Sequence, residues 1–211
     1  KWLELGKHDA LYPMMYYKDD LFYPYLDDWV SKNNNRILVP GLGAYQMVEL
    51  KWSLKDITDQ INYARNNKAQ GQAYFRTENL LSNTNGILDS LKLYYKNPAK
   101  LPPMSWLSDS IPSKPFDIMA QRLDNELFQL KWNFEDNQNR ITFNVYRSET
   151  DDLCTDKTHK ILATGLKSNV FSLPVENNDK AYYYYITVSD SYHNESEVST
   201  PAFFYHSETI K

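Results

Sequence analysis

Short apolar runs alternate with helical periodicities along the first half of the chain. The apolar runs are continuous, which is typical of strands covered on both faces, and they lie at residues 10–16, 37–42 and 72–75. Stretches with apolar residues at helical spacing follow them, at residues 25–33, 53–67 and 87–95. Pro13 and Pro40 lie inside two of the runs, where each removes one backbone donor. The alternation predicts three βα units in a row, and therefore a parallel sheet or part of a βα barrel.

The clearest helix signal is a capping pair at residue 53. Ser53 is followed three residues later by Asp56, which is a capping-box-like spacing. Leu54, Ile57 and Ile61 then recur on one helical face. The pattern predicts a helix that begins after Ser53 and ends near residue 67.

Residues 112–206 contain short alternating segments separated by polar turns. These segments predict strands at residues 127–134, 141–147, 160–163, 170–173, 181–188 and 202–205. About seven strands in roughly 95 residues are typical of an antiparallel sandwich of immunoglobulin-like architecture. A proline-rich stretch over residues 98–115 separates the two halves. We expect the boundary between Ser108 and Lys114, with domains over residues 1–108 and 109–211.

Composition and charge narrow the possible functions. The 211 residues carry 23 Lys and Arg against 27 Asp and Glu, so the chain lacks the basic surplus that nucleic-acid binding needs. No apolar run approaches the roughly 18–20 residues of a membrane span, and no signal peptide begins the chain. The chain starts at Lys1, which suggests a processed product or a fragment. The length excludes a complete TIM-type barrel of about 250 residues together with a second domain.

Few residues offer metal or redox chemistry. Cys154 is the single cysteine, so an intrachain disulfide and a zinc ribbon are excluded. The histidines have no spacing typical of a metal site: His8, His159, His193 and His206. We therefore expect no metal and no cofactor. The 17 tyrosines either fill a sandwich core or, at a cleft, stack on sugar rings.

Residues 112–206 resemble a fibronectin type III domain. The resemblance rests on the order and spacing of five motifs: PxxP at residues 112–115, LKW at 130–132, NVYR at 144–147, YYYITV at 183–188 and NES at 194–196. It implies that one of Tyr182 to Tyr184 is the structural tyrosine corner, and nothing in this part looks catalytic.

Residues 1–107 resemble the end of the glycoside hydrolase-like 10 family, a group of exported bacterial βα-barrel proteins. The matching motifs are WLxxG at residues 2–6, DxLYPMxY at 9–16, VPGLGAY at 39–45, QIxxAR at 60–65, GQAYF at 71–75 and LPPMSWL at 101–107. The resemblance implies the last three βα units of an incomplete TIM-type barrel, followed by the sandwich. It also implies a periplasmic or cell-surface protein that acts on cell-wall or related glycans.

The chain departs from this family in two ways. Arg76 replaces the serine usual after the last strand, and the first five or so βα units are absent. The chain alone is therefore expected to be inactive. Three βα units leave the sheet edge at residues 10–16 unpaired, so we expect the chain to self-associate, to pair with another chain or to lean on the sandwich.

Glycoside hydrolysis generally needs two carboxyl groups, which in a barrel lie at the carboxyl ends of strands. Glu78 is the candidate catalytic acid; its alternative is a solvent-exposed loop carboxylate. The candidate substrate-binding residues are Tyr16, Tyr17, Tyr45, Gln46 and Arg76. The tyrosines could instead pack around a barrel rim, and Arg76 could pair with Glu78 at the surface.

Two functions remain open on the sequence. The chain is either part of a glycoside hydrolase that supplies substrate-contacting residues, or a noncatalytic module of the cell envelope that binds glycan or protein. Release of reducing ends from cell-wall glycans by the longer protein separates them.

Overall fold

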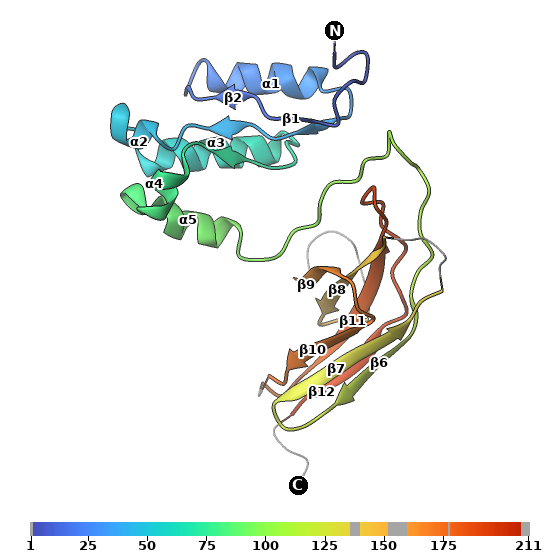
Figure 1. Cartoon of the computed structure of the whole chain (residues 1–211). Helices are drawn as coiled ribbons and strands as arrows, with labels where there is room; N and C mark the ends of the chain where they lie inside the picture. The colour runs from blue at the N-terminus through green and yellow to red at the C-terminus, as the bar shows by residue number, and fades with distance from the viewer. Residues whose placement is uncertain (1, 136–139, 152–159, 177, 208–211) are drawn as a thin grey trace. The chain divides into compact units, whose positions relative to one another are not determined.

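The computed structural model describes residues 2–135, 140–151, 160–176 and 178–207. Cys154 and His159 lie outside these residues. Contacts divide the chain into two compact units, Lys1–Lys96 and Asn97–Lys211 (Figure 1). The sequence-based domain boundary, between Ser108 and Lys114, remains a prediction.

The first unit combines helices with very short strands. Its strands are β1 (Ala10–Leu11), β2 (Met14–Met15), β3 (Ile37–Leu38), β4 (Gly41–Leu42) and β5 (Ala73–Tyr74). Its helices are α1 (Phe22–Lys32), α2 (Gln46–Glu49), α3 (Leu54–Asn66), α4 (Thr77–Leu81), the 3-10 turn η1 (Thr84–Gly86) and α5 (Ile87–Tyr94). β1 pairs with β3 in one sheet, and β2, β4 and β5 form a second, all in parallel.

The predicted fold class, three βα units of a TIM-type barrel, is wrong. The predicted strands at residues 10–16 and 37–42 each break into two strands of two residues, and the one at 72–75 keeps only two residues. These short strands belong to two separate small sheets. The helices α2 and α4 and the turn η1 also interrupt the expected strand–helix alternation. Across the described residues, most of the regular strand structure is antiparallel and lies in the second unit.

The two prolines explain why the predicted strands break. The Pro13 carbonyl accepts from the Gly41 N–H at 2.8 Å, and the Pro40 carbonyl accepts from the Ala73 N–H at 3.0 Å. Neither proline has an N–H to return to its neighbour, so the ladder lacks a bond at each position. β1 and β2 are the outer strands of their sheets. Self-association through residues 10–16 remains a prediction.

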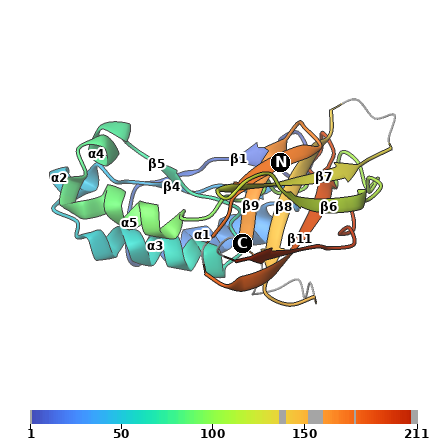
Figure 2. The same ribbon diagram turned by 90° about the horizontal axis from the view of Figure 1, so that it is seen from below.

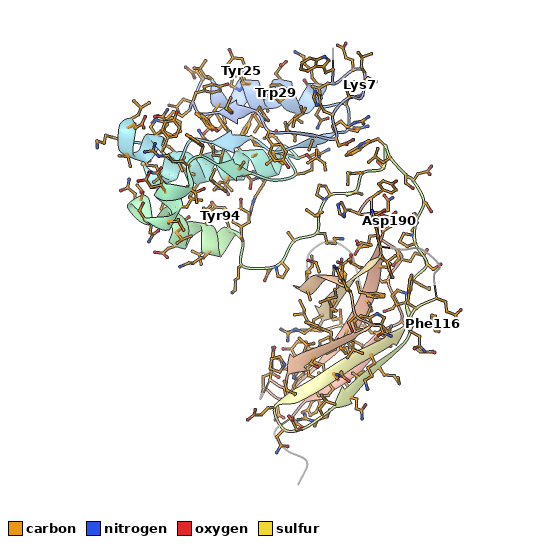
Figure 3. The ribbon with its side chains drawn as sticks, in the orientation of Figure 1. Lys7, Tyr25, Trp29, Tyr94, Phe116 and Asp190 are labelled. Carbon is orange, nitrogen blue, oxygen red and sulfur yellow. The ribbon has the colours of Figure 1, made fainter. Side chains whose placement is uncertain are left out.

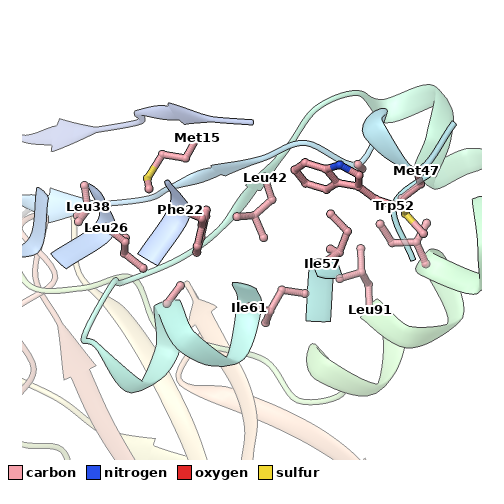
Figure 4. Packing of buried hydrophobic residues seen from close by; sticks show 13 residues of the cluster. Met15, Phe22, Leu26, Leu38, Leu42, Met47, Trp52, Ile57, Ile61 and Leu91 are labelled. Atoms are coloured by element: carbon pink, nitrogen blue, oxygen red, sulfur yellow. The ribbon is translucent and has the colours of Figure 1, made fainter. Parts of the chain in front are cut away.

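The core of the first unit lies between the strands and helices α1, α3 and α5. The capping box at Ser53 is present: its hydroxyl accepts from the Asp56 N–H, and the Asp56 carboxylate accepts from the Ser53 N–H. Figure 4 shows side chains from strands and helices meeting in this core, and the fully buried members include Met15, Phe22, Leu26, Leu42, Ile57 and Ile61. None of the described helices has the length and apolar character that crossing a membrane requires.

The second unit is an antiparallel sandwich of two sheets (Figure 2). One sheet has the order β10 (Val170–Pro174), β7 (Leu127–Asn133), β6 (Phe116–Arg122). The other has the order β12 (Ala202–His206), β11 (Lys180–Ser189), β8 (Thr142–Ser148), β9 (Lys160–Leu166). This division of the strands is fibronectin type III-like. The six predicted strands are confirmed, whereas β6 has no counterpart among the ranges read from the sequence.

The sandwich core is formed by buried side chains that alternate with more exposed ones along strand β7. Phe128, Leu130 and Trp132 on β7 are buried, and they face Val145, Tyr184, Ile186 and Phe204 from the opposite sheet. Phe128 stacks on Phe204, with ring centroids 4.0 Å apart. Such period-two burial of large side chains is the main stabilising term of a sandwich.

The linker segment, residues 97–108, is attached to the second unit through the loop after β11. Lys100 forms an ion pair with Glu195, the Met104 N–H donates to the Tyr192 carbonyl at 2.8 Å, and Asn194 donates to the Ser108 carbonyl at 2.9 Å. Asp190, labelled in Figure 3, organises that loop by accepting from the N–H groups of Tyr192 and Asn194.

His206 is fully buried in the sandwich with both ring nitrogens engaged. Its Nδ1 accepts from the Glu176 N–H at 2.8 Å, so the neutral ring carries its proton on Nε2, 2.7 Å from the Tyr184 hydroxyl. Burial lowers the pKa of His206; the charge of Glu176 opposes this shift, and those of Arg147 and Arg122 add to it.

Acid is therefore expected to destabilise the second unit. The unfolded histidine titrates near its ordinary pKa of about 6.5, whereas the folded one resists protonation. Below that pH the unfolded state binds the extra proton, so stability falls as the pH is lowered. Melting temperatures between pH 7.5 and 5 measure the effect. His206→Gln should flatten this part of the curve, and an unchanged slope in that variant would contradict the assignment.

Candidate functional site

Three aromatic rings meet at the carboxyl edge of the β2–β4–β5 sheet. The Tyr16 ring stacks on Phe75 with centroids 5.4 Å apart and 19° between the planes. Tyr45 lies edge-on to both, 5.7 Å from Tyr16 and 5.4 Å from Phe75. We call Tyr16, Tyr45 and Phe75 the aromatic cluster. The parallel strand direction explains the meeting, because each residue follows the end of its strand on the same side.

Two glycines let the Tyr16 side chain lie close to β4. A Cβ added at Gly41 would lie 3.3 Å from Cε1 of Tyr16 and 3.2 Å from the Pro13 carbonyl oxygen. A Cβ added at Gly43 would lie 3.3 Å from Cα of Tyr16 and 3.2 Å from Cγ of Gln46. The absence of side chains at these two positions is therefore what admits the ring.

Gly43→Ala is expected to destabilise the first unit by about 1–3 kcal/mol, because the added methyl group presses on the backbone of Tyr16. Urea or thermal unfolding measures the change. Gly71→Ala is the matched control, since a Cβ there meets only the Val39 side chain at an ordinary 3.5 Å. Equal effects of the two substitutions would show that the packing around Gly43 is not tight.

Gln46 connects two residues of the aromatic cluster by hydrogen bonds. It is the first residue of α2, and its side chain is buried. Its Nε2 donates to the Tyr45 hydroxyl at 3.0 Å and to the Tyr16 carbonyl at 3.4 Å. The Tyr45 N–H donates to the Phe75 carbonyl at 3.0 Å. Burial, followed by the neighbouring Tyr45, raises the pKa of Tyr16, so its hydroxyl stays protonated and can donate.

The other predicted site residues make different contacts. Tyr17 packs against Tyr25, with centroids 5.8 Å apart, and its carbonyl accepts from Gln60. Arg76 and Glu78 pair with each other at 3.2 Å, with side chains 50% and 76% exposed. Glu78 lies in the first turn of α4 and not in a loop. The structure therefore brings together Tyr16, Tyr45 and Gln46, and it leaves Arg76 and Glu78 as an exposed ion pair.

Phe75 belongs to the cluster but was not among the predicted site residues. It is the last residue of the third apolar run, so its position at the same sheet edge as Tyr16 was available from the sequence. Its side chain is 47% exposed, which is unusual for a phenylalanine in contact with two tyrosines. Phe75 is the exposed ring of the cluster, and such a ring offers stacking to the apolar face of a ligand.

In the described part of the chain, no group of three or more His, Cys, Asp or Glu side chains could hold a metal ion.

Comparison with known proteins gives one informative relative. No model of a known protein family matches the chain. The chain is similar to the glycosyl hydrolase YngK of Bacillus subtilis (strain 168), with 30% identity over an alignment of 216 residues. The match covers 94% of this chain and 41% of the relative. The chain is therefore related to a protein named as a glycosyl hydrolase, and it spans less than half of that protein's length.

Solved structures match over about half of the chain. A Fn3-like protein from Clostridium thermocellum is 20% identical, with a TM-score of 0.37, over 48% of this chain and 99% of that one. The pectate lyase Pel3 of Pectobacterium carotovorum is 20% identical, with a TM-score of 0.34, over 41% of this chain and 26% of that one.

Proposed function

We propose that this chain is part of a larger glycoside hydrolase, and that the aromatic cluster binds one sugar ring of its substrate. The observation that carries the proposal is the meeting of Tyr16, Tyr45 and Phe75 with Gln46 at one sheet edge. The exposed Phe75 ring can cover the apolar face of a pyranose, and the Tyr45 hydroxyl, which accepts from Gln46, can donate to a sugar hydroxyl. The relation to a glycosyl hydrolase supports this substrate class.

The substrate is proposed to be a cell-wall or related glycan, and the protein to act outside the cytoplasm in the bacterial envelope. The resemblance of residues 1–107 to the glycoside hydrolase-like 10 family supports this finer assignment. The chain alone is proposed not to hydrolyse glycans, because the main catalytic carboxyl groups would come from the remainder of the larger protein.

Glu78 is the carboxylate proposed to take part from this chain. Arg76 pairs with it at 3.2 Å, and this charge-assisted contact would orient the carboxylate. Substrate binding would have to displace solvent from a side chain that is 76% exposed.

The test uses the full-length protein that contains this chain and measures release of reducing ends from bacterial cell-wall glycans. Phe75→Ala is expected to raise KM about 3- to 10-fold through loss of stacking. Tyr12→Ala is the control, since Tyr12 is also an exposed ring of the first unit, at 63%. An unchanged KM for Phe75→Ala would remove the aromatic cluster from substrate binding.

Glu78→Gln tests the acid separately. A loss of about 10²- to 10⁴-fold in kcat is expected if Glu78 acts in proton transfer. Unchanged turnover would remove Glu78 from the mechanism and leave the binding role of the aromatic cluster intact.

A noncatalytic glycan-binding module is the second candidate. The observation that favours it is the exposure of the Arg76–Glu78 pair, which resembles an ordinary surface ion pair. Under this proposal the full-length protein would retain glycan and release no reducing ends, and Phe75→Ala would still weaken retention.

A further inference from the structure

A small pocket lined by both apolar and polar residues lies in the second unit, on the face of the β12–β11–β8–β9 sheet that points away from the core. Its volume is about 200 Å³. Phe143 and Val145 of β8 and Val188 of β11 face the core, so the alternate residues Asn144 and Ser189 face the pocket. All the residues that line it belong to the second unit, whereas the aromatic cluster belongs to the first.

Buried polar groups fix the floor of this pocket. Asn144 is 2% exposed, and its Nδ2 donates to the Ser189 hydroxyl at 2.9 Å and to the Thr187 hydroxyl at 3.1 Å. These bonds orient the amide and both hydroxyls before any ligand arrives. Such preorganised polar groups are typical of binding sites.

A β-bulge shapes one wall. The register of β8 and β9 shifts between Phe143↔Leu166 and Val145↔Ala163, so Thr164 and Gly165 together lie opposite Asn144. Gly165 has φ +70°, a conformation that favours glycine. Bulges redirect side chains and are frequent beside functional sites. Here the bulge places Thr164 in the lining of the pocket.

The remaining wall comes from the linker segment. Lys100 lines the pocket, but its charge is matched by the ion pair with Glu195. Within the described ranges, the Thr142 and Thr164 hydroxyls and the His193 ring line the pocket without a hydrogen-bond partner. The pocket thus offers uncommitted groups that can both donate and accept, without a free charge.

We propose that this pocket binds a single neutral sugar ring. Sugar hydroxyls donate and accept, as the hydroxyl, amide and imidazole groups of the lining do. The volume equals that of about six or seven waters at roughly 30 Å³ each, and it is below the roughly 300–1,000 Å³ of sites for larger ligands. There is room for one ring and not for an oligosaccharide. The inference goes beyond the proposed hydrolase role and does not depend on it.

The test titrates the isotope-labelled 211-residue chain separately with methyl β-glucopyranoside, N-acetylglucosamine and inorganic phosphate, following backbone amides by NMR. One or both sugars should shift the signals of Asn144, Gly165 and Ser189. Thr164→Val, which replaces only the hydroxyl, should weaken binding about 2- to 10-fold. Thr200→Val, the same change at an exposed position of this unit, should leave it unchanged.

Three results would overturn the proposal: no shift of these signals with either sugar, shifts with phosphate alone, or equal affinity of Thr164→Val and the unmodified chain. A thermal melt of each variant shows whether it folds, and Thr142→Val serves as the second variant if Thr164→Val does not. Shifts confined to Tyr45 and Phe75 would support the aromatic cluster and reject the pocket. Shifts confined to the pocket residues would support the pocket and reject the aromatic cluster as the binding site of these sugars.

Discussion

Phe128→Ala is expected to destabilise the second unit by about 3–5 kcal/mol. Phe128 is fully buried, stacks on Phe204 and has the His206 ring 5.1 Å away. Its removal would leave a cavity that rigid strands on both sides cannot close. Denaturant unfolding followed by near-ultraviolet circular dichroism measures the loss.

The neighbouring residue supplies the control for this substitution. Leu127 lies on the same strand with its side chain on the other face, 40% exposed, so Leu127→Ala should cost less than about 1 kcal/mol. Similar losses for the two variants would mean that the register of β7 differs from the one described.

Glu195→Ala is expected to cost about 2–4 kcal/mol, because it leaves several donors without their acceptor. The carboxylate accepts from Tyr146 and, at 2.6 Å, from Thr187, and it pairs with Lys100. Burial raises the pKa of Glu195, but hydrogen bonds from Lys100, Thr187 and Tyr146 outweigh burial and lower it below the ordinary value. The carboxylate therefore stabilises the fold above its ordinary pKa, and this contribution fades as the pH falls through the depressed one.

Glu197→Ala is the matched control for Glu195→Ala. Glu197 lies two residues further on, with a side chain 84% exposed and 3.8 Å from Lys114. Its loss should change stability by less than about 0.5 kcal/mol. Limited proteolysis adds a second readout, since Glu195→Ala should release the linker segment and expose it to cleavage. Protection equal to that of Glu197→Ala would show that Lys100 and Glu195 do not hold the segment.

Much of the sandwich could be predicted from the sequence because strands such as β7 have a period of two. Phe128, Leu130 and Trp132 alternate with polar residues, and all three are buried. Strand β6 was not predicted, because its pairing register with β7 shifts between Phe116 and Met119 and this irregularity interrupts the alternation of apolar and polar residues. The capping box at Ser53 likewise fixed the start of α3.

The first unit could not be predicted equally well, because local signals were weak or misleading. Continuous apolar runs favour long strands, but prolines removed ladder donors from two of them. Helices α2 and α4 begin after Tyr45 and Arg76, and neither residue caps its helix through a side-chain hydrogen bond. The sequence therefore contains no capping residue that would predict where these helices begin. A repeat of strands and helices was therefore inferred where short strands and extra helices occur.

The candidate site was predictable in part. Tyr16, Tyr45 and Gln46 follow strand ends, and parallel pairing brings strand ends together. Tyr17 follows Tyr16 directly, but its ring packs against Tyr25. Position alone could not show that Arg76 and Glu78 would pair at the surface, because that depends on the start of α4.

Each hydrophobic core contains one well-buried indole: Trp52 is 4% exposed in the first unit, and Trp132 is 1% exposed in the second. Indole emission shifts to longer wavelength when water reaches the ring. Replacing either tryptophan by phenylalanine removes the emission of that core's buried indole from the sum of the five tryptophans. The difference in emission between each variant and the unmodified chain thus follows one core during unfolding, without an added label.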